Sequence, residues 1–598
     1  MRRKKARSSR FLTAFSSTQP FLKAHPSHYT FTTFYMLAKE LGIRYDMLKE
    51  RKGMTTSSTS LSTNQASVQT ELFRPPLTYP VHPYDEMLTR TAERYPEHVA
   101  VISKGVNLTY RELEALVNAF ANALQELGVS KGQKVCLFMT NRAEYVISWF
   151  AVTRLGATVS PINPSYKERE VAYQIDNSES VAVVVQHDLL PLVEARRTET
   201  PTLQSVIVVG SNLHQPSAHV YAFSQLVRTH PPTPPSRSEI GWEDVVALPY
   251  SSGTTGLPKG VMLSHKNLVC NAYQSIATAR ITFEDRMLVF LPLYHIYGIM
   301  LLGCAALAGA RLILMERFEP ERSLQLIQEQ GITLLYSVPQ VLSTLSEWPQ
   351  LDAYDMHTVR FTQCGAAPVP PALAHRFQER THIPVMTSYG LTEASPGTHS
   401  NPVYYPQLIK VETIGLPIHD TQQKIVDIET GERELGVGEE GELIVRGPQV
   451  MQGYWKAPEA TAEAVRSGWL YTGDIGWRDE EGYVTITDRK KEMIKVKGFS
   501  VAPAQIEALF LEHPAVVDVA VIAKPHEEAG EVPKAFVVLR AGHEHVSTAE
   551  LIAWANGKLA TFKNVREIEF VEAIPRNPSG KILRRVLKHQ ERQRMGLS

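Results

Sequence analysis

Short β-branched runs alternate with longer helical stretches from Pro80 onward, and this alternation limits the fold more than any other feature of the sequence. Helical stretches such as residues 142–155, closed by Gly156, lie between several of the runs. The buried strands predicted before residue 249 are 135–139, 158–161, 181–185, 205–209 and 245–248. The pattern predicts an α/β fold of helix-covered, largely parallel sheets, whose ligand sites lie beyond the carboxyl ends of the strands.

The later part of the chain continues this alternation and then changes it. The elements predicted next are a helix from Ser264, strands 287–291 and 311–315, a helix ending at Leu307 and a helix over 321–330. Residues 422–450 contain turn signals that predict a β-rich subdomain of hairpins. The elements predicted after Asp488 are helices 503–511 and 548–560, strands 517–522 and 535–539, and a basic helix from Ile582.

The length of 598 residues exceeds what one hydrophobic core usually supports, so at least two subdomains are expected. The charge-rich segment 488–495 marks the predicted boundary between a large and a small domain. We therefore expect a disordered or targeting extension over 1–75, a large domain over 76–487 and a small α+β domain over 488–598.

The first residues have the composition of a targeting segment. Residues 1–39 contain basic residues and several serines, but no acid precedes Glu40. This suits an organellar transit peptide. An untranslated upstream stretch is the alternative, since Met36, Met47 and Met54 are all potential starts. We expect a cytoplasmic protein, or a mitochondrial one if the extension is a transit peptide.

The overall composition favours an enzyme acting on small molecules. Lys plus Arg (62) equals Asp plus Glu (62), which gives no field to recruit nucleic acid or an anionic membrane. The four cysteines share no CxxC spacing, which argues against a structural zinc site or a disulfide framework and for a reducing compartment. The apolar run over 299–310 is shorter than the roughly 20 residues that span a bilayer. We expect a buried helix there; peripheral membrane contact and oligomeric state stay open.

The segment 249–260 has the sequence P-Y-S-S-G-T-T-G-L-P-K-G. Glycines permit tight turns, and hydroxyl and amide donors form an anion-binding concavity that Lys259 can close with its charge. A polyphosphate is the natural ligand. The segment is not a Walker A loop, because Pro258 and Gly260 stand where that motif needs glycine and a hydroxyl residue. The alternative is a mobile surface loop.

Four further stretches contain more glycines, hydroxyl-bearing residues and charged residues than the packing of a core requires. They are Q-C-G-A-A-P (363–368), S-Y-G-L-T-E (388–393), Y-T-G-D (471–474) and N-P-S-G-K-I-L-R-R (577–585). Singly, each has a structural explanation as a turn, a helix cap or a surface lysine. Together, in this order and at these separations, they are not explained by chance.

With these motifs, the sequence resembles the adenylate-forming superfamily of acyl-CoA synthetases, aryl-CoA ligases, firefly-type luciferases and peptide-synthetase adenylation domains. The resemblance covers residues 80–585. It implies that residues 76–487 are an AMP-binding adenylation domain, which binds ATP and a carboxylic acid. It also implies that residues 488–598 form a mobile domain that swings between two poses.

The resemblance assigns nucleotide-binding roles to individual residues. It implies that the β- and γ-phosphates contact Ser251, Ser252, Gly253, Thr254, Thr255, Gly256 and Lys259. It implies that the nucleoside contacts Gly365, Ala366, Ala367, Tyr389, Gly390, Asp474 and Arg489. Tyr389 would stack on adenine, and Asp474 would accept hydrogen bonds from the ribose. Thr392 would contact the α-phosphate, and Glu393 would hold Mg²⁺ together with phosphates and water.

Residues of the small domain receive the remaining roles by the same resemblance. Lys581 would reach the substrate carboxylate and the α-phosphate while charge shifts between them. Lys491 would be the hinge position, and Lys495 with Gly498 would present the face on which coenzyme A forms the thioester. Without the resemblance, Lys490, Lys491, Lys495 and Lys497 would be interpreted as a solvated basic strand.

The acyl site is predicted from fewer residues. His295 in L-P-L-Y-H-I-Y-G would gate the acid-binding tunnel, although a histidine beside apolar residues is more often a satisfied core residue. Residues 299–308 are apolar and lack the aspartate that binds an amino-acid ammonium in amino-acid adenylation domains. The substrate is therefore expected to be an acid without an amino group.

The expected activity is an AMP-forming ligation of a medium- or long-chain fatty acid to coenzyme A. The alternatives are an aryl-acid ligase of the coumarate type, a luciferase, and a non-catalytic acyl or nucleotide binder. The presence of Lys259, Glu393, Asp474, Arg489 and Lys581 argues against the non-catalytic binder. A peptide-synthetase module is not expected, because no carrier domain follows Lys581.

Overall fold

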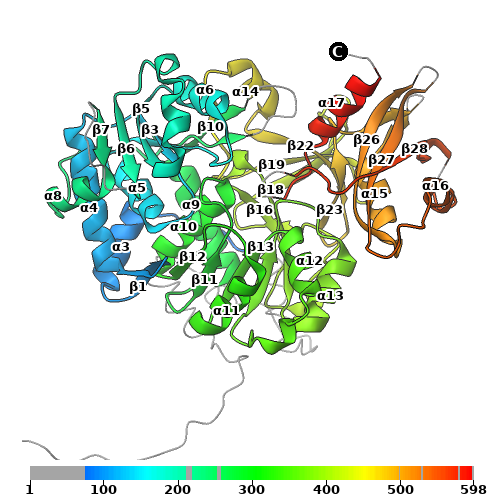
Figure 1. Cartoon of the computed structure of the whole chain (residues 1–598), viewed down its shortest axis with the longest axis horizontal. Coiled ribbons are helices and arrows are strands. Elements are labelled where there is room, and N and C mark those ends of the chain that lie inside the picture. Colours follow the sequence, from blue (N-terminus) through cyan, green and yellow to red (C-terminus); the bar gives the residue numbers. More distant parts are fainter. Residues whose placement is uncertain are drawn as a thin grey trace, which may run out of the picture.

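The computed structural model of the chain describes residues 74–210, 219–251, 258–496, 499–526, 529–559, 561–576 and 580–595. Two helix-covered sheets occupy the blue to green part of Figure 1, and a smaller unit in orange and red, from α15 to α17, lies beside them. A third sheet lies between these parts. The chain is thus a mixed α/β protein with a large N-terminal domain and a smaller C-terminal domain.

The first sheet is parallel from β1 to β15, with antiparallel strands at both edges. Its strands, in spatial order, are β17 (Leu416–Pro417), β16 (Gly397–Ser400), β15 (Val385–Gly390), β14 (Phe361–Cys364), β13 (Leu334–Ser337), β11 (Arg286–Val289), β12 (Arg311–Leu314), β1 (Val99–Ser103) and β2 (Val106–Thr109). The central strands are almost wholly buried because helices cover both faces of the sheet, as the predicted apolar runs require.

The second sheet confirms the strands predicted before residue 249. Its strands, in spatial order, are β20 (Gly453–Tyr454), β10 (Lys259–Ser264), β8 (Val245–Ala247), β4 (Thr158–Pro161), β3 (Lys134–Phe138), β5 (Ser180–Gln186), β6 (Ser205–Val209) and β7 (Val220–Ala222), with β9 (Tyr250–Ser251) beside β10. The strands from β8 to β7 are parallel, whereas β10 is antiparallel to β8, β9 and β20.

Helices pack on both sheets and between them. In the large domain they are α3 (Glu86–Arg94), α4 (Tyr110–Glu126), α5 (Ala143–Arg154), α6 (Glu168–Ser178), α7 (Leu190–Glu194), α8 (Phe223–Thr229), α9 (His265–Ala279), α10 (Ile296–Ala308), α11 (Pro320–Gln330), α12 (Pro339–Glu347), α13 (Pro371–Thr381) and α14 (Pro458–Ala464). Every residue of α10 is buried. This confirms that the longest apolar run is a core helix, and no helix in the described part of the chain has the length and hydropathy to cross a membrane.

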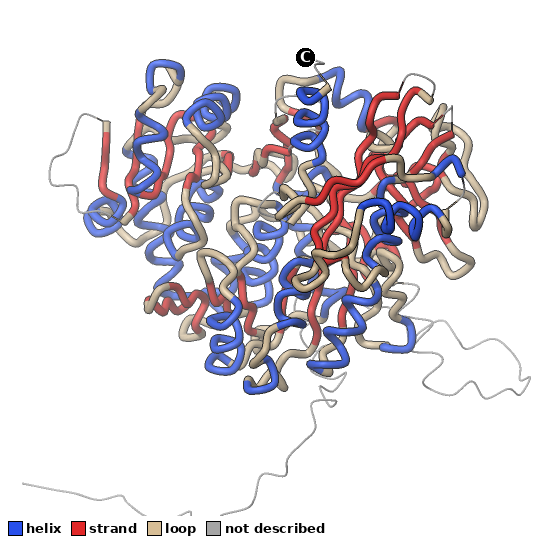
Figure 2. Tube along the Cα trace, turned by 45° about the vertical axis from the view of Figure 1, so that its right-hand side comes forward, coloured by secondary structure: helices blue, strands red, loops and turns tan. Residues whose placement is uncertain are grey.

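The third sheet is antiparallel, as the turn signals predict. Its strands are β18 (Gln422–Val426), β19 (Gly441–Arg446), β22 (Trp469–Arg478), β21 (Val465–Arg466) and β23 (Val484–Arg489). The fourth sheet and its helices form the small unit and comprise β24 (Ile494–Val496), β25 (Phe499–Val501), β26 (Val516–His526), β27 (Gly530–Leu539), β28 (Glu567–Phe570), α15 (Pro503–Leu511), α16 (Thr548–Asn556) and α17 (Arg584–Arg594). Figure 2 shows the red strands of this unit apart from the helix-rich first two sheets.

The small unit has apolar clusters of its own, separate from the large cluster that joins the first three sheets. The predicted boundary at 488–495 falls between these clusters in the sequence and stays a prediction. The predicted helix 548–560 is too long, because α16 ends at Asn556 and Gly557 follows as its C-cap. The final helix starts at Arg584, two residues after the predicted position.

Asn267 connects the start of α9 to the third-sheet side of the molecule. Its Oδ1 accepts from the backbone N–H of Ser264 at 2.9 Å, and the Ser264 hydroxyl accepts from the Asn267 N–H in return, which forms a buried capping box. Its Nδ2 donates to the carbonyls of Pro448 and Val450, both at 2.8 Å. One side chain thus satisfies polar groups of two segments far apart in the sequence.

Replacement of Asn267 by Ala is expected to lower the free energy of unfolding by about 2–4 kcal/mol, because it leaves buried groups of both segments unpaired. Thermal and urea unfolding would measure the loss. Thr109→Ala is the matched control, since it removes an exposed capping box at α4 and should cost about 1 kcal/mol. An equal loss in both variants would contradict the connecting role of Asn267.

Candidate active site

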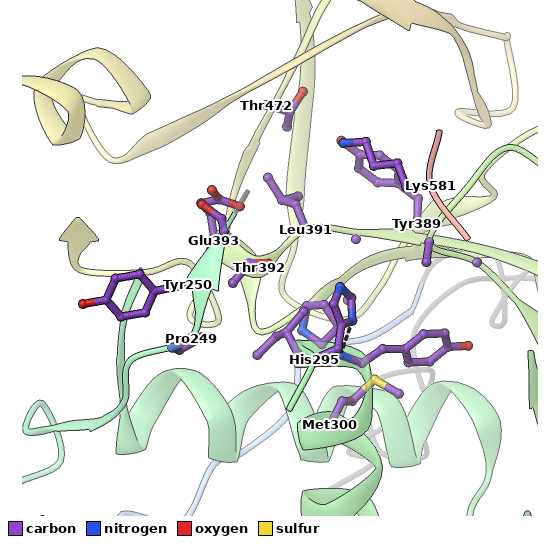
Figure 3. Close-up of a pocket in the computed structure, with 18 of the residues that line it drawn as sticks. Pro249, Tyr250, His295, Met300, Tyr389, Leu391, Thr392, Glu393, Thr472 and Lys581 are labelled. Atoms are coloured by element: carbon purple, nitrogen blue, oxygen red, sulfur yellow. Dashed lines mark hydrogen bonds between the residues drawn. The ribbon is translucent and has the colours of Figure 1, made fainter. Parts of the chain in front are cut away.

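A cavity of about 1260 Å³ lies where the two large sheets, the third sheet and the C-terminal segment meet. The first sheet contributes the carboxyl ends of β13, β14 and β15, where ligands of parallel α/β sheets are expected. The start of α10, the β9–β10 hairpin and the end of β23 complete the walls. In Figure 3, Glu393 and Tyr250 lie on one side of Leu391, Lys581 and Tyr389 on the other, and His295 and Met300 below.

The predicted phosphate loop joins two paired strands. Ser251 of β9 lies opposite Lys259 of β10, and both line the cavity. The predicted roles of Ser252, Gly253, Thr254, Thr255 and Gly256 fall outside the described residues. The helix predicted from Ser264 is α9, but the strand β10 before it was not predicted, so Lys259 extends from a strand and not from a helix N-terminus.

Contacts to α6 hold both ends of this loop. The Tyr250 hydroxyl donates to Asn177 Oδ1 at 2.7 Å, and the Tyr173 hydroxyl donates to the Pro258 carbonyl at 3.0 Å. The two anchored ends fix where the loop leaves and re-enters the second sheet. The positions of Tyr250 and Pro258, which flank the loop, are therefore set by α6 as well as by strand pairing.

Tyr454 connects the predicted phosphate and metal residues. Its hydroxyl donates to Glu393 Oε1 at 2.8 Å, and the Lys259 ammonium lies 5.3 Å from the centre of its ring. Burial raises the pKa of Tyr454 well above its ordinary value, so the phenol stays a donor. The backbone carbonyl of Glu393 accepts from the Met451 N–H at 2.8 Å, which fixes the short helical turn Thr392–Ala394. Lys259 and Glu393 thus both contact Tyr454, one over its ring and the other at its hydroxyl.

The remaining oxygen of Glu393 suits a shared magnesium ion. The carboxylate lines the cavity beside Thr392. Within the described residues, no group of three or more His, Cys, Asp or Glu side chains could hold a metal by itself. One carboxylate that shares the ion with phosphate oxygens and water is the arrangement that Mg²⁺ prefers at nucleotide sites. The donor set therefore fits the predicted metal role of Glu393.

Close packing of β14 against β15 shapes the predicted adenine site. A Cβ on Gly365 would lie 2.9 Å from Ser388 Oγ and 3.0 Å from the Ser388 carbonyl oxygen, so only glycine fits without a shift. Ala366 has a φ of 66°, which turns the chain away after β14. Gly365, Ala366, Tyr389 and Gly390 line the cavity, whereas Ala367 is not among its lining residues. The sequence prediction for Ala367 is thus not supported by a cavity contact.

Asp474 is the centre of a buried polar group at the predicted ribose site. Its side chain accepts from the Tyr389 hydroxyl and pairs with Arg489, whose Nε lies 2.8 Å from Oδ1. Asp474 is only 3% exposed and does not line the cavity, unlike its two partners. The Asp474 carboxylate raises the pKa of Arg489, which stays charged. In this arrangement Asp474 orients Tyr389 and Arg489 towards the cavity.

His295 caps α10 at the junction of the nucleotide side and the inner part of the cavity. Its Nδ1 accepts from the Tyr297 N–H at 3.3 Å, so the neutral ring carries its proton on Nε2. Burial lowers the pKa of His295 to about 4, and the nearby Lys581 cation adds to this effect. The imidazole is therefore neutral at physiological pH and can donate a hydrogen bond without adding charge.

Lys581 enters the cavity from the small unit and lies beside Tyr389 (Figure 3). Burial lowers its pKa to about 8, with a further contribution from Arg489, against the attraction of Asp474, Glu492 and Glu393. Its segment is held by Arg584, which pairs with Glu492 and donates to both Glu507 oxygens at 2.7 and 2.6 Å. These contacts fix the strand-like segment that carries Lys581.

The predicted hinge and thioester residues lie around the end of β23. Lys491 is exposed and lines the cavity, Lys495 of β24 lies outside it, and Gly498 is outside the described residues. Asp488 Oδ2 accepts from the Ala504 N–H at 3.1 Å, in the first turn of α15. Burial raises the pKa of Asp488 to about 7. The small unit is thus attached to the third sheet in a pose that brings in Lys581 but not Lys495.

The inner part of the cavity takes little of its lining from the apolar stretch 299–308. Of residues 299–308, only Met300 lines it, because the rest of α10 packs into the core. The other lining residues here are Ser275, Thr278 and Ala279 of α9, Tyr297 of α10 and Tyr336 of β13. The rings of Tyr297 and Tyr336 are nearly perpendicular, with centres 6.1 Å apart.

Sequence reasoning missed several of these lining residues. Tyr454 and Tyr336 carry no motif, and Thr278 sits in an ordinary amphipathic helix. The G-Y-W sequence at 453–455, two residues after the Met451 contact to Glu393, is the one local signal that could have indicated Tyr454. Only the packing of distant segments brings the others to the cavity.

Comparisons with known proteins identify the family. Residues 88–455 match the family described as AMP-binding enzyme, and residues 505–581 match the AMP-binding enzyme C-terminal domain. A 4-coumarate–CoA ligase of Pinus taeda is 37% identical over 85% of this chain and 94% of the relative. A long-chain-fatty-acid–CoA ligase of Bacillus subtilis (strain 168) is 34% identical over 84% and 94%.

Solved structures have the same architecture. The anthranilate CoA ligase AuaEII in complex with anthranoyl-AMP superposes with a TM-score of 0.80 at 27% identity, covering 87% of this chain and 99% of that one. ATP-bound MatB from Rhodopseudomonas palustris gives a TM-score of 0.78 at 29% identity, with coverages of 85% and 99%. This chain therefore belongs to the AMP-binding enzymes, as an acyl-CoA synthetase of the adenylate-forming superfamily that its motifs indicated.

Proposed function

We propose that the acid activated by this ATP-, Mg²⁺- and coenzyme A-dependent ligase is aromatic. The observation that carries the proposal is the lining of the inner cavity. There the rings of Tyr297 and Tyr336 are nearly perpendicular with centres 6.1 Å apart, and Met300 is the one residue of the apolar stretch 299–308 that lines the cavity. Edge-to-face packing suits a flat ring. The relative from Pinus taeda, named as a 4-coumarate ligase, and the anthranilate ligase structure support the proposal.

A medium- or long-chain fatty acid is the competing substrate. This alternative is supported by the absence of Asp and Glu from residues 299–308. It is also supported by the Bacillus subtilis relative, which is named as a long-chain-fatty-acid ligase. The cavity lining supports it less, since most of α10 lies in the core. Peripheral membrane contact, which a fatty acid would make useful, stays an expectation.

In the first half-reaction, a carboxylate oxygen of the acid attacks the α-phosphorus of ATP and pyrophosphate leaves. The attack brings an anion against an anion, so the positive groups must be in place beforehand. Lys581 and Lys259 both line the cavity, and Lys259 lies over the ring of Tyr454; in the proposed mechanism Lys581 would approach the carboxylate and the α-phosphate, and Lys259 the leaving phosphates. Mg²⁺ on Glu393 would supply further neutralisation of phosphate charge.

In the second half-reaction, the sulfur of coenzyme A attacks the acyl carbonyl carbon and AMP leaves. The neutral His295 would lie beside the reacting end of the acid and would add no second cation there. We expect the small unit to turn about Lys491, so that Lys581 leaves and the face with Lys495 enters. The hydrogen bond from Ala504 to Asp488 is one contact that such a turn would break.

A substrate series tests the proposed acid. Pyrophosphate release would be followed with cinnamate, benzoate and dodecanoate, with and without coenzyme A. We expect kcat/KM to be at least about tenfold higher with the better aromatic acid than with dodecanoate. Even one methylene group that does not fit a pocket gives discrimination of this size. A higher value for dodecanoate would replace the aromatic proposal with the fatty-acid one.

Two lysine variants test the two-pose mechanism reciprocally. Lys581→Ala should lower acyl-adenylate formation by about 10² to 10³ fold and spare thioester formation from supplied acyl-AMP. Lys495→Ala should spare adenylate formation and slow the thioester step. Each variant is the control for the other, and Lys588→Ala on α17, outside the cavity lining, controls for loss of surface charge. Equal losses in both half-reactions for either variant would contradict its role.

The pKa of Lys581 predicts how adenylation depends on pH. The ammonium is present below about pH 8 and lost above it, so kcat/KM for the adenylation step should fall as pH rises through about 8. Lys581→Arg should remove this fall, because a guanidinium stays charged at every pH used. A pH–rate profile of pyrophosphate release would measure it. A fall that persists in the arginine variant would assign the titration to another group.

A further inference from the structure

The start of β10 is held on both sides, by β9 and by the segment that follows β20. Gly260 comes directly after the cavity-lining Lys259 and pairs with Tyr250 of β9. Its carbonyl accepts from the N–H of Trp455 at 2.8 Å. A Cβ on Gly260 would lie 3.3 Å from Cε2 of the Tyr250 ring and 3.0 Å from Leu248, so a larger residue would push the ring away. The position of Lys259 therefore depends on where Tyr250 and Trp455 lie.

Asn177, in the last turn of α6, binds both of these aromatic side chains. The Tyr250 hydroxyl donates to Asn177 Oδ1 at 2.7 Å, and the Trp455 Nε1–H donates to the Asn177 backbone carbonyl at 2.9 Å. Burial raises the pKa of Tyr250 well above its ordinary value, so this hydroxyl keeps its proton. Neither Asn177 nor Trp455 is among the described lining residues of the cavity. Asn177 can therefore act on a ligand there only through its partners.

The side chain of Asn177 is not needed to end α6. Asparagine often closes a helix in the left-handed conformation, but Glu179 adopts that conformation here, with a φ of 56°. Asparagine is also a poor helix former, so at this position it costs helix stability. The bond to Tyr250 explains its presence, because the better helix formers Ala and Leu have no acceptor for a hydroxyl.

Charged residues hold the Trp455 ring against the second sheet. The Lys134 ammonium, at the start of β3, lies 4.0 Å from the centre of the ring, within the range of a cation–π contact. The ammonium groups of Lys134 and Lys456 both pair with the Glu179 carboxylate, at 3.7 and 3.0 Å. The segment after β20 is thus tied to the end of α6 at two adjacent residues.

This segment also carries Tyr454, which precedes Trp455. The Tyr454 hydroxyl donates to Glu393 Oε1, and the Lys259 ammonium lies 5.3 Å from the centre of its ring. A displacement of the segment would therefore move the predicted phosphate cation and the predicted metal carboxylate together.

We propose that Asn177 is a positioning residue for the two phosphates of ATP that leave as pyrophosphate. It holds the start of β10 from both sides and so places Lys259, and it holds the segment that contacts Glu393. The inference rests on the phosphate role proposed above for Lys259 and deepens it. It is independent of which acid the enzyme activates.

Binding of two nucleotides tests this inference separately from turnover. The probes are α,β-methylene-ATP with Mg²⁺, and AMP, which share the adenosine and differ in the β- and γ-phosphates. Calorimetry on the full chain would measure both dissociation constants. Asn177→Ala and Tyr250→Phe should each weaken binding of the ATP analogue about three- to tenfold, as for the loss of one hydrogen bond, and leave AMP binding unchanged. Because both changes remove the same bond, the double variant should bind no more weakly than either single variant.

Two control variants keep the test independent of folding defects. Asn556 also ends a helix, α16, and its side chain bonds the N–H and the carbonyl of Val565 at 2.8 and 3.0 Å, outside the cavity lining. Asn556→Ala should lower the melting temperature and leave both dissociation constants intact. Lys259→Ala should weaken binding of the ATP analogue without weakening that of AMP. Tyr250→Phe leaves α6 intact and stays informative if Asn177→Ala unfolds this helix.

The outcomes separate the inference from the role of Lys259 on which it rests. Unchanged binding of the ATP analogue in Asn177→Ala and Tyr250→Phe, with a loss in Lys259→Ala, would overturn the inference alone. Equal losses for the ATP analogue and AMP would mean that Asn177 serves only the fold, and would equally overturn it. Unchanged binding of the ATP analogue in Lys259→Ala would overturn the phosphate role of Lys259 and this inference together.

Discussion

The ion pair between Arg489 and Asp474 is the interaction on which the assembly of the active site depends. It joins β22 to β23, and the Tyr389 hydroxyl adds β15 of the first sheet to the same carboxylate. One buried anion thus holds three strands from two sheets. Because β23 is the last strand before the small unit, its position also determines where the segment with Lys581 can reach the cavity.

Three cationic side chains reach the cavity from different parts of the fold. Lys259 comes from a strand of the second sheet, Lys581 from the small unit and Arg489 from the third sheet. Each is supported by contacts that do not involve the other two, such as the pairing of Arg584 with Glu492 and Glu507 behind Lys581. Arg489 and Lys581 repel each other, yet the scaffold holds both at one cavity, ready for an anionic substrate.

Much of the fold could be predicted from the sequence where local signals were strong. The strands 158–161 and 205–209 were predicted with the observed bounds, because β-branched runs end sharply at turn residues. The helix 503–511 was also predicted with its observed bounds, because Pro503 fixes its first turn. The strand β10 between the glycine-rich loop and α9 was missed. Its existence depends on pairing with β8 and β20, which local sequence does not encode.

The candidate site divides in the same way. Its nucleotide side could be predicted, because glycines and charges such as Gly365, Glu393 and Lys581 stand out against the composition of a packed core. The inner end could not. Thr278 and Tyr336 are ordinary residues of a helix and a strand, and only the tertiary structure shows that their hydroxyls are buried with no partner in the described part of the chain. The apolar run 299–310 was correctly predicted to be a buried helix, but the sequence did not show that most of this helix packs into the core instead of lining the cavity.

Because Ser251 of β9 pairs with Lys259 of β10, the position of the Lys259 charge does not depend on the conformation of the residues between them. The register of β9 against β10 sets the direction of the Lys259 side chain, whatever path the intervening residues take. Because side chains alternate along a strand, a shift of one residue in β10 would turn the lysine to the opposite face. Changes in the length of the loop would leave it in place. Evolution can therefore vary the residues between Ser251 and Lys259 without repositioning this cation.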